Sequence, residues 1–161
     1  MIKLIQYLKC ESEKETPVLD NIKDIIYRPI KEREISVTYK RALGGNATED
    51  ITPCATMFLN FNYTKTPEKY LSDSSNVMVN YIHGNLDSPE SVIFGCGDEL
   101  DSSFKQLQNK TDNECMRHIK SIRYLESDNY RKMLEFIESD SFQVIIMGHS
   151  CGISDRTLLN T

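Results

Sequence analysis

Three stretches of the chain share one pattern, in which an apolar run of strand length ends at a polar turn. The first is Ala55 to Phe61, where Asn60 is the only residue that is neither apolar nor β-favouring. The second, Val77 to Ile82, ends at a His-Gly pair, and the third, Phe142 to Met147, ends at a Gly-His-Ser turn. Short apolar runs bounded by turn residues are typical of buried strands. We therefore predict a strand at each of the three positions.

The polar groups that follow these strands are candidate ligand contacts. Open α/β sheets bind ligands at the C-terminal edge of their strands, because the backbone there turns into the next helix and leaves a crevice. Strand ends that converge on one edge would bring together Asn62, His83 and the turn Gly148 to Ser150. Periodicity does not show which strands are neighbours. The shared site is therefore a hypothesis about how the three segments assemble.

Residues 1–54 are predicted to form a mainly helical lead-in to these strands. Apolar residues at helical spacing indicate a first helix that ends in the charged stretch Glu11 to Thr16, and a second helix over Val18 to Tyr27. Ile35, Val37 and Tyr39 alternate with polar residues, which predicts a half-exposed strand before the first apolar run.

Helical patterns also follow the strands and would cover the sheet. Thr66-Pro67-Glu68 has the hydroxyl cap, early proline and first-turn acid of a helix start. Residues 99–110 and 116–122 carry weaker helical patterns, whereas Tyr130 to Ile137 marks the firmest helix, with Ser127 or Asp128 as its cap. The run Val92 to Phe94 is expected to form a hairpin or edge pair. We expect one domain over residues 1–161, with the motifs in residues 55–161.

The composition narrows the class of protein. A chain of 161 residues, with 39% hydrophobic and 27% charged residues, fits one globular domain without a membrane span. Its first residues lack the apolar core and cleavage site of a secretory signal, so we expect a cytoplasmic protein. The net charge of -5 and the lack of a long basic tract argue against nucleic acid as a partner.

The cysteines predict neither a disulfide framework nor a metal site. There are 5 cysteines, which is an odd number, and they are widely spaced along the chain. Cys115 and His118 form the only pair with metal-ligand spacing. Because a zinc site needs a second such pair, we predict that the protein binds no metal.

The turn Gly148-His149-Ser150-Cys151-Gly152 matches the G-x-S-x-G nucleophile elbow of serine hydrolases. In that fold the acid and the histidine follow the serine, but only 11 residues follow Ser150 and none is histidine. A serine hydrolase therefore remains an alternative only. The same turn could instead cradle a nucleotide, with Asp155 accepting hydrogen bonds from hydroxyl groups. Ser150 and Asp155 could also simply cap the next helix.

The histidine and the asparagine at the strand ends each have two interpretations. His83 has a side chain whose ordinary pKa suits a general base, but a hydrogen-bonded turn histidine has the same sequence. The amide of Asn62 could hold a ribose hydroxyl or an attacking water, or it could close the strand as a turn former. Each motif is weak when taken separately.

Taken together, the motifs resemble those of the bacterial abortive infection AbiH family, which acts in phage defence. The resemblance covers roughly Thr56 to Leu159 and rests on the segments Asn60 to Glu68, Tyr81 to Gly84, Ile93 to Gly95, and Ile146 to Ser150 with Asp155. That family is in turn similar to Sir2-like domains, whose Thr-Thr-Asn-Tyr-Asp, His-Gly and Gly-x-Ser motifs line an NAD site on a Rossmann-like sheet. The implied fold is therefore a Rossmann-like, three-layer α/β domain with a mostly parallel sheet.

The resemblance implies antiphage defence, with NAD as the ligand and as the substrate of an NAD glycohydrolase. It places Asn62 at the nicotinamide ribose and His83 as the catalytic base. The implied nucleotide contacts are Tyr63, Thr64, Gly84, Gly148, His149, Ser150 and Asp155. The expected partners are the nucleotide and either a second copy of the chain or a phage-derived trigger. A non-catalytic fragment or interaction module is the other alternative.

The chain departs from the family pattern at three places. AbiH-like chains usually open with a strand and a Gly-Asn-Gly-Phe-Asp-type turn, and no such sequence occurs before Ala55. We therefore expect the domain to be incomplete at its N-terminus. Thr64 stands where Sir2-like domains have aspartate, and Cys151 stands where AbiH relatives usually have leucine.

Overall fold

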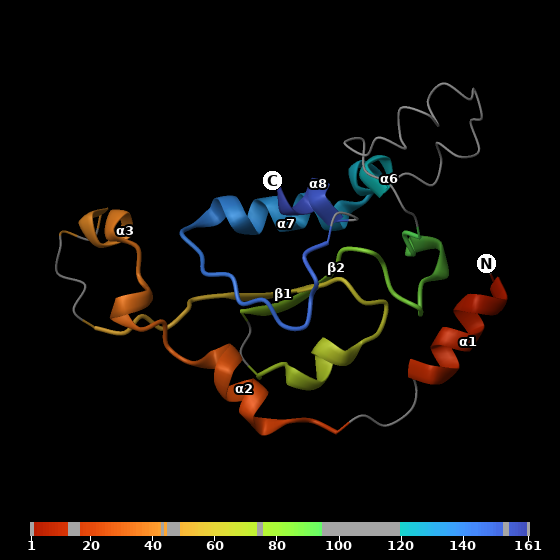
Figure 1. The fold of residues 1–161 in the computed structure, drawn as a ribbon, viewed down its shortest axis with the longest axis horizontal. Coiled ribbons are helices and arrows are strands. Elements are labelled where there is room, and N and C mark those ends of the chain that lie inside the picture. The colour runs from red at the N-terminus through yellow and green to blue at the C-terminus, as the bar shows by residue number, and fades with distance from the viewer. Residues whose placement is uncertain are drawn as a thin grey trace.

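The fold combines helices with a small parallel sheet (Figure 1). The computed structural model describes residues 2–12, 17–42, 44, 49–73, 76–94, 120–152 and 155–160. In chain order, its helices and strands are α1 (Ile2–Ser12), α2 (Asp20–Tyr27), α3 (Val37–Ala42), β1 (Thr56–Asn60), β2 (Val77–Tyr81), α6 (Lys120–Glu126), α7 (Asp128–Ser139) and α8 (Arg156–Leu159). Short 3-10 helices cover Glu32–Glu34, Thr66–Tyr70 and Pro89–Ser91.

The sheet consists of β1 and β2, which pair in parallel. Their register runs from Thr56 opposite Val77 to Asn60 opposite Tyr81, so both strands end at the same level. The first two predicted strands and their parallel direction are therefore confirmed. Within the described ranges this two-stranded sheet is the whole of the β structure apart from one isolated bridge, and a Rossmann-like three-layer fold is not confirmed.

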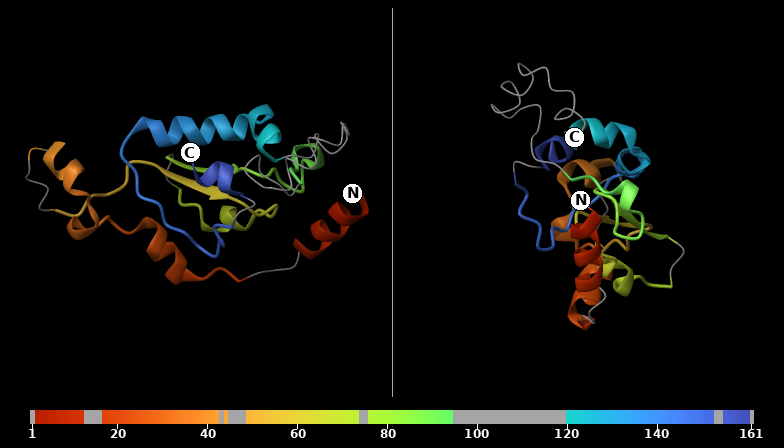
Figure 2. Two further views of the ribbon diagram at one scale, coloured as in Figure 1. Left: turned by 45° about the horizontal axis from the view of Figure 1, so that its top comes forward. Right: turned by 90° about the vertical axis from the view of Figure 1, so that its right-hand side faces the viewer.

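Helices lie on both sides of the two strands (Figures 1 and 2). Helices α6, α7 and α8 lie above the strands in Figure 1, whereas α2 and the 3-10 helix Thr66–Tyr70 lie below them. The buried core is on the side of α6, α7 and α8, where it contains Ile82, Ile93, Tyr124, Met133 and Leu158. The ends of both strands are therefore anchored to residues that come much later in the chain.

Helix α7 is joined to β2 by a pair of asparagine side chains. The amide of Asn80 donates to the backbone oxygen of Asn129 at 2.7 Å, and the amide of Asn129 donates to the backbone oxygen of Tyr81 at 2.7 Å. The hydroxyl of Ser127 accepts a hydrogen bond from the backbone N–H of Asn129. The predicted cap of this helix is confirmed, and asparagine in an apolar strand is explained by its bond to the helix.

The half-exposed strand predicted at residues Ile35 to Tyr39 is wrong. The segment instead forms the 3-10 helix Glu32–Glu34 followed by α3. The hydroxyl of Ser36 accepts from the backbone N–H of Tyr39 at 3.2 Å, which stabilises the first turn of α3. Because the side chain of Val37 is 65% exposed, the alternation of apolar residues does not mark a face that packs on a core.

The strand predicted at Phe142 to Met147 is also wrong. This segment is irregular and forms no β ladder with any residue that the structure describes. Its side chains are exposed, with Val144 at 68% and Ile146 at 63%. An apolar run forms a parallel strand only where a neighbouring strand accepts its backbone hydrogen bonds and both faces are covered. Neither condition is met by the described part of the chain.

Two further predictions changed in detail. Val92 to Phe94 forms no hairpin with any residue that the structure describes. The backbone N–H of Ile93 donates to the backbone oxygen of His83 at 2.9 Å. The helix predicted to start at Thr66 is the short 3-10 helix Thr66–Tyr70, with Lys65 at its cap position. The helical pattern at 99–110 lies outside the described residues, as do Cys115 and His118. Of the pattern at 116–122, residues 116–119 also lie outside them, and residues 120–122 belong to α6.

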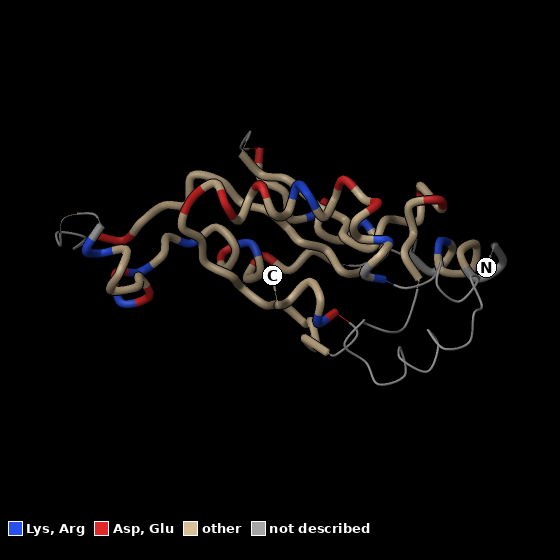
Figure 3. The backbone as a smooth tube through the Cα atoms, turned by 90° about the horizontal axis from the view of Figure 1, so that it is seen from above, with Lys and Arg blue, Asp and Glu red and all other residues tan. Residues whose placement is uncertain are grey.

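Acidic and basic residues are both scattered over the described helices and loops, whereas β1 and β2 contain no charged residue (Figure 3). None of the described helices is long and apolar enough to cross a membrane.

Candidate functional site

The side chain of His83 connects the ends of both strands to helix α6. His83 follows β2 and is only 4% exposed. Its Nδ1 lies 2.9 Å from the backbone oxygen of Phe61, which follows β1, and its Nε2 lies 2.7 Å from the hydroxyl of Tyr124 in α6. Because a carbonyl oxygen only accepts, Nδ1 must carry a hydrogen. In a neutral ring, Nε2 then accepts a hydrogen bond from the Tyr124 hydroxyl.

The surroundings of His83 favour this neutral ring. Burial, and then the positive charge of Lys120, lower the pKa of His83 below its ordinary value of 6.5. The carbonyl of Phe61 and the carboxylate of Asp155 act in the opposite direction but are outweighed. His83 is therefore mostly unprotonated near pH 7, which is the state that a general base requires.

Asp155 is the hub of a buried ionic cluster. Asp155 is 6% exposed. Its Oδ1 lies 2.9 Å from Nζ of Lys120 and 3.3 Å from Nε2 of His83. Its Oδ2 lies 3.3 Å from Nε2 of His149. Asp155 occupies the cap position of α8, but its carboxylate makes no capping hydrogen bond. The interpretation of Asp155 as a simple helix cap is therefore wrong.

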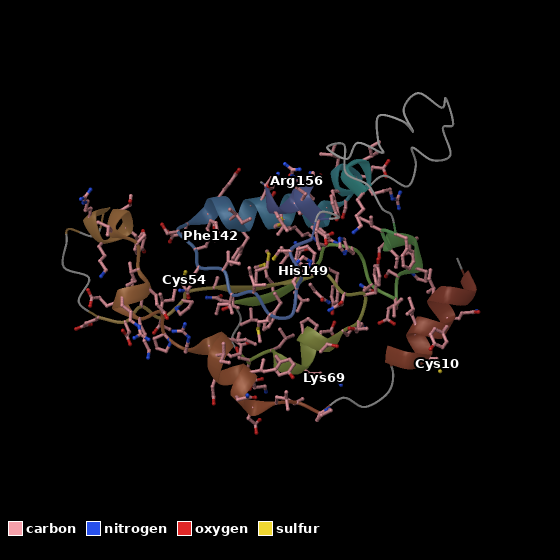
Figure 4. The ribbon with its side chains drawn as sticks, viewed as in Figure 1. Cys10, Cys54, Lys69, Phe142, His149 and Arg156 are labelled. Carbon is pink, nitrogen blue, oxygen red and sulfur yellow. The ribbon has the colours of Figure 1, made fainter. Side chains whose placement is uncertain are left out.

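His149 holds the loop 148–152 against the end of β1 (Figure 4). Its ring centroid lies 4.0 Å from that of Phe61. Its Nδ1 accepts from the backbone N–H of Cys151 at 3.0 Å, so in the neutral ring the hydrogen is on Nε2 and faces Asp155. Both nitrogens of His149 are therefore used within the chain.

The turn after β1 is shaped by the side chain of Asn60. Its Oδ1 accepts from the backbone N–H of Asn62 at 3.0 Å, and its Nδ2 donates to the backbone oxygen of Thr64 at 2.8 Å. This arrangement leaves the side chain of Asn62 exposed. Tyr63 turns inward, where its hydroxyl donates to the backbone oxygen of Ile93 at 3.1 Å, and burial raises the pKa of Tyr63.

Two glycines form the turns beside these histidines, for different reasons. Gly84 has φ +77, and a Cβ there would lie 2.2 Å from the backbone oxygen of Ser91, so only glycine fits. Gly148 has φ +68, but a Cβ there would meet nothing within 4 Å. Gly84 is therefore needed for packing, whereas the space around Gly148 is open.

The structure brings some of the predicted site residues together and leaves others apart. His83, His149 and Asp155 meet through direct contacts, and Tyr63 lies beside His83 with a ring-centroid distance of 6.3 Å. Asn62 and Ser150 are exposed, and neither makes a hydrogen bond to His83 in the described part of the chain. Asn62 and Ser150 therefore lie at the same edge of the sheet as the buried residues but do not belong to their hydrogen-bonded group.

The geometry gives little support to a serine hydrolase. An elbow should follow a strand, but residues 142–147 do not form one. Ser150 makes no hydrogen bond to a histidine within the described residues, and both nitrogens of neighbouring His149 have other partners. The non-glycine residue with positive φ in this turn is Cys151, at 49°, and not Ser150.

Sequence reasoning missed Lys120 and Tyr124, which are buried at 9% and 2% exposure. They lie four residues apart in α6 and therefore share one face of that helix. This spacing is the only indication in the sequence. A lysine is almost never buried without a partner, and the partner Asp155 is 35 positions away in the chain. Among the described residues, no group of histidine, cysteine and acidic side chains is arranged to hold a metal ion.

The comparisons with known proteins give one match. A family model described as bacteriophage abortive infection AbiH matches residues 5–161. No curated protein and no solved structure matches the chain. The family match confirms the resemblance that the motifs indicated.

Proposed function

The chain belongs to the bacteriophage abortive infection AbiH family, and from that premise we propose that it acts in phage defence by binding and cleaving NAD. Membership of the family itself indicates the defence role. The nucleotide and the reaction are our proposal. In this proposal, the ends of β1 and β2 form a Sir2-like nucleotide site.

The observation that supports a site here is the meeting of three chain segments around the ring of His83. Phe61 after β1 accepts from this ring at 2.9 Å. Asp155 from the C-terminal segment lies 3.3 Å from the ring, and His149 joins the same carboxylate at 3.3 Å. Ligands of open α/β sheets bind at the edge where parallel strands end. A set of polar side chains converging at this edge favours it over the other turns of the chain.

Exposed groups at the same edge supply the proposed nucleotide contacts. The side chain of Asn62 is exposed after β1, and Gly148 and Ser150 are exposed in the neighbouring loop. Because the space at Gly148 is open, a ligand can approach the backbone closely there. In the proposal the loop holds the phosphates and ribose hydroxyls of NAD, and Thr64 flanks them from the turn after β1.

In the proposed reaction, a water molecule attacks the anomeric carbon of the nicotinamide ribose. The bond between carbon and nitrogen breaks, and its electron pair leaves with nicotinamide. His83 takes the proton that the water loses, so NAD and water yield ADP-ribose, nicotinamide and a proton. Asn62 orients the ribose or the water with its amide. Since His83 is 4% exposed and bonded at both nitrogens, ligand binding must open its contact with Tyr124.

The experiment is the release of nicotinamide from NAD, measured by chromatography on the purified protein. The variants are Asn62→Ala and His83→Ala, and the matched control is Asn21→Ala, an exposed asparagine in α2. Loss of a positioned general base typically lowers a rate by about a hundredfold or more. We expect such a loss in His83→Ala, a clear loss in Asn62→Ala, and no change in Asn21→Ala.

Two results would contradict the proposal. One is a protein that neither binds nor consumes NAD, even when it is purified from phage-infected cells. The other is turnover that survives both substitutions while the variants stay folded by circular dichroism. Labelling of Ser150 by a fluorophosphonate probe would instead support the hydrolase alternative.

A further inference from the structure

Lys120 and Tyr124 lie one turn apart on α6 and both reach the space behind His83. We propose that this pair positions His83, with the Tyr124 hydroxyl donating a hydrogen bond to Nε2 and Lys120 neutralising the carboxylate beside the same nitrogen. The inference deepens the proposed function, in which His83 is the base. It assigns a role to two residues that the proposed chemistry does not itself use.

The distances explain how the pair would select one tautomer of His83. Two groups compete for Nε2, since the hydroxyl of Tyr124 lies at 2.7 Å and Oδ1 of Asp155 lies at 3.3 Å. A carboxylate there favours a proton on Nε2, because it can only accept. Nζ of Lys120 lies 2.9 Å from the same Oδ1, so the charge of Lys120 offsets that of Asp155. The hydroxyl of Tyr124 then donates the shorter hydrogen bond to a neutral ring.

Contacts between aromatic rings also fix the orientation of the His83 ring. The rings of His83 and Tyr124 are nearly parallel, with an interplanar angle of 15° and centroids 5.8 Å apart. Tyr130 extends the stack, with its ring 6.3 Å from that of Tyr124. The stack and the hydrogen bond to Phe61 restrain the His83 ring from flipping. His83 therefore keeps its lone pair directed at α6 until a ligand hydroxyl or water replaces Tyr124.

The charged groups around His83 come from three segments. Lys120 belongs to α6, Asp155 precedes α8, and His149 lies in the loop 148–152. Lys120 and His149 oppose protonation of His83, whereas Asp155 favours it. Substituting Tyr124 leaves all three in place, which makes it the sharpest single change.

The test is nitrogen-15 NMR of the histidine side chains in the wild type, Tyr124→Phe and Tyr130→Phe. The wild type is expected to carry its His83 proton on Nδ1 near pH 7. Tyr124→Phe keeps the ring and removes only the hydroxyl, so the neutral form loses its donor and the pKa of His83 should rise by about one unit. Tyr130→Phe removes the same atom one ring farther away and should leave that pKa unchanged.

A wild-type His83 with its proton on Nε2 would overturn the inference, and so would a pKa that is equal in the wild type and Tyr124→Phe. The wild-type spectrum alone gives one of these answers, even if a variant fails to fold. None of these measurements needs turnover of NAD, so the inference can fail while the proposed function stands. If NAD is cleaved, the acid limb of the pH–rate profile should move upward in Tyr124→Phe with the pKa of His83.

Discussion

The buried ion pair between Lys120 and Asp155 provides a quantitative test of the site. The two side chains are 11% and 8% exposed, and Nζ lies 2.9 Å from Oδ1. Lys120→Met removes the charge and keeps most of the side-chain length, which leaves the carboxylate buried beside two histidines. Breaking a buried pair in this way costs about 3–5 kcal/mol. That is a large share of the roughly 5–15 kcal/mol that stabilises a typical domain.

The double variant Lys120→Met with Asp155→Asn should recover part of this loss, because it removes the uncompensated charge as well. Arg123→Met is the matched control on the same helix. Arg123 pairs with Glu126 at 2.9 Å, but the two side chains are 37% and 60% exposed. We expect that control to lose less than about 1 kcal/mol, since exposed ion pairs contribute little.

The assay is urea unfolding followed by circular dichroism. The wild type, Lys120→Met, Asp155→Asn and the double variant form a double-mutant cycle and are measured in one buffer. The coupling energy between the two sites isolates the pair from other effects of each substitution. A coupling energy below about 0.5 kcal/mol would refute the reasoning. So would a loss in Lys120→Met that is no larger than the loss in Arg123→Met.

Three other predictions concern the same region. Gly84→Ala should lower the free energy of unfolding by well over about 1 kcal/mol in urea titrations, because its Cβ would lie 2.2 Å from the backbone oxygen of Ser91. Gly148→Ala should lower it by only about 1 kcal/mol, because φ is positive there but the space is open. Equal losses of stability in the two variants would contradict this. Ser127→Ala should lower the same free energy by about 1 kcal/mol, since it removes the cap of α7, and an unchanged urea midpoint would argue against the cap. The pKa of His83 is lower in the folded chain than its ordinary 6.5, so the unfolded chain binds the proton more readily and stability should fall as the pH drops from 7 through 6.5; His83→Gln should flatten that part of the pH–stability curve.

Local pattern was sufficient for the elements whose neighbours are close in the chain. The apolar runs at β1 and β2 are separated by one short 3-10 helix and pair directly. The apolar spacing of α7 and the hydroxyl of Ser127 lie in one continuous segment. In these cases the residues that determine the structure lie close together in the sequence, so a local pattern reveals them.

Two of the failures occurred where a distant partner decides the structure, and one occurred where a local hydrogen bond does. The run Phe142 to Met147 has the composition of a buried strand, but no neighbouring strand pairs with it in the described residues. The alternation at Ile35 to Tyr39 was overridden by a hydrogen bond to Ser36 at the start of α3. Lys120 is buried because of Asp155, and sequence alone does not reveal such a pairing.

The candidate site was partly predictable for the same reason. His83 and Asp155 were identified from turns at strand and helix ends, and the structure joins them at 3.3 Å. Their second partners on α6 were missed, because a lysine and a tyrosine four positions apart are usual on any amphipathic helix.

The most direct test of the account is the NAD content of bacteria that express the protein during phage infection. Cells carrying the wild type should lose NAD after infection and release fewer phages, whereas cells carrying Asn62→Ala or His83→Ala at equal protein levels should keep their NAD and lose protection. Protection by the wild type with NAD unchanged would contradict the proposed reaction.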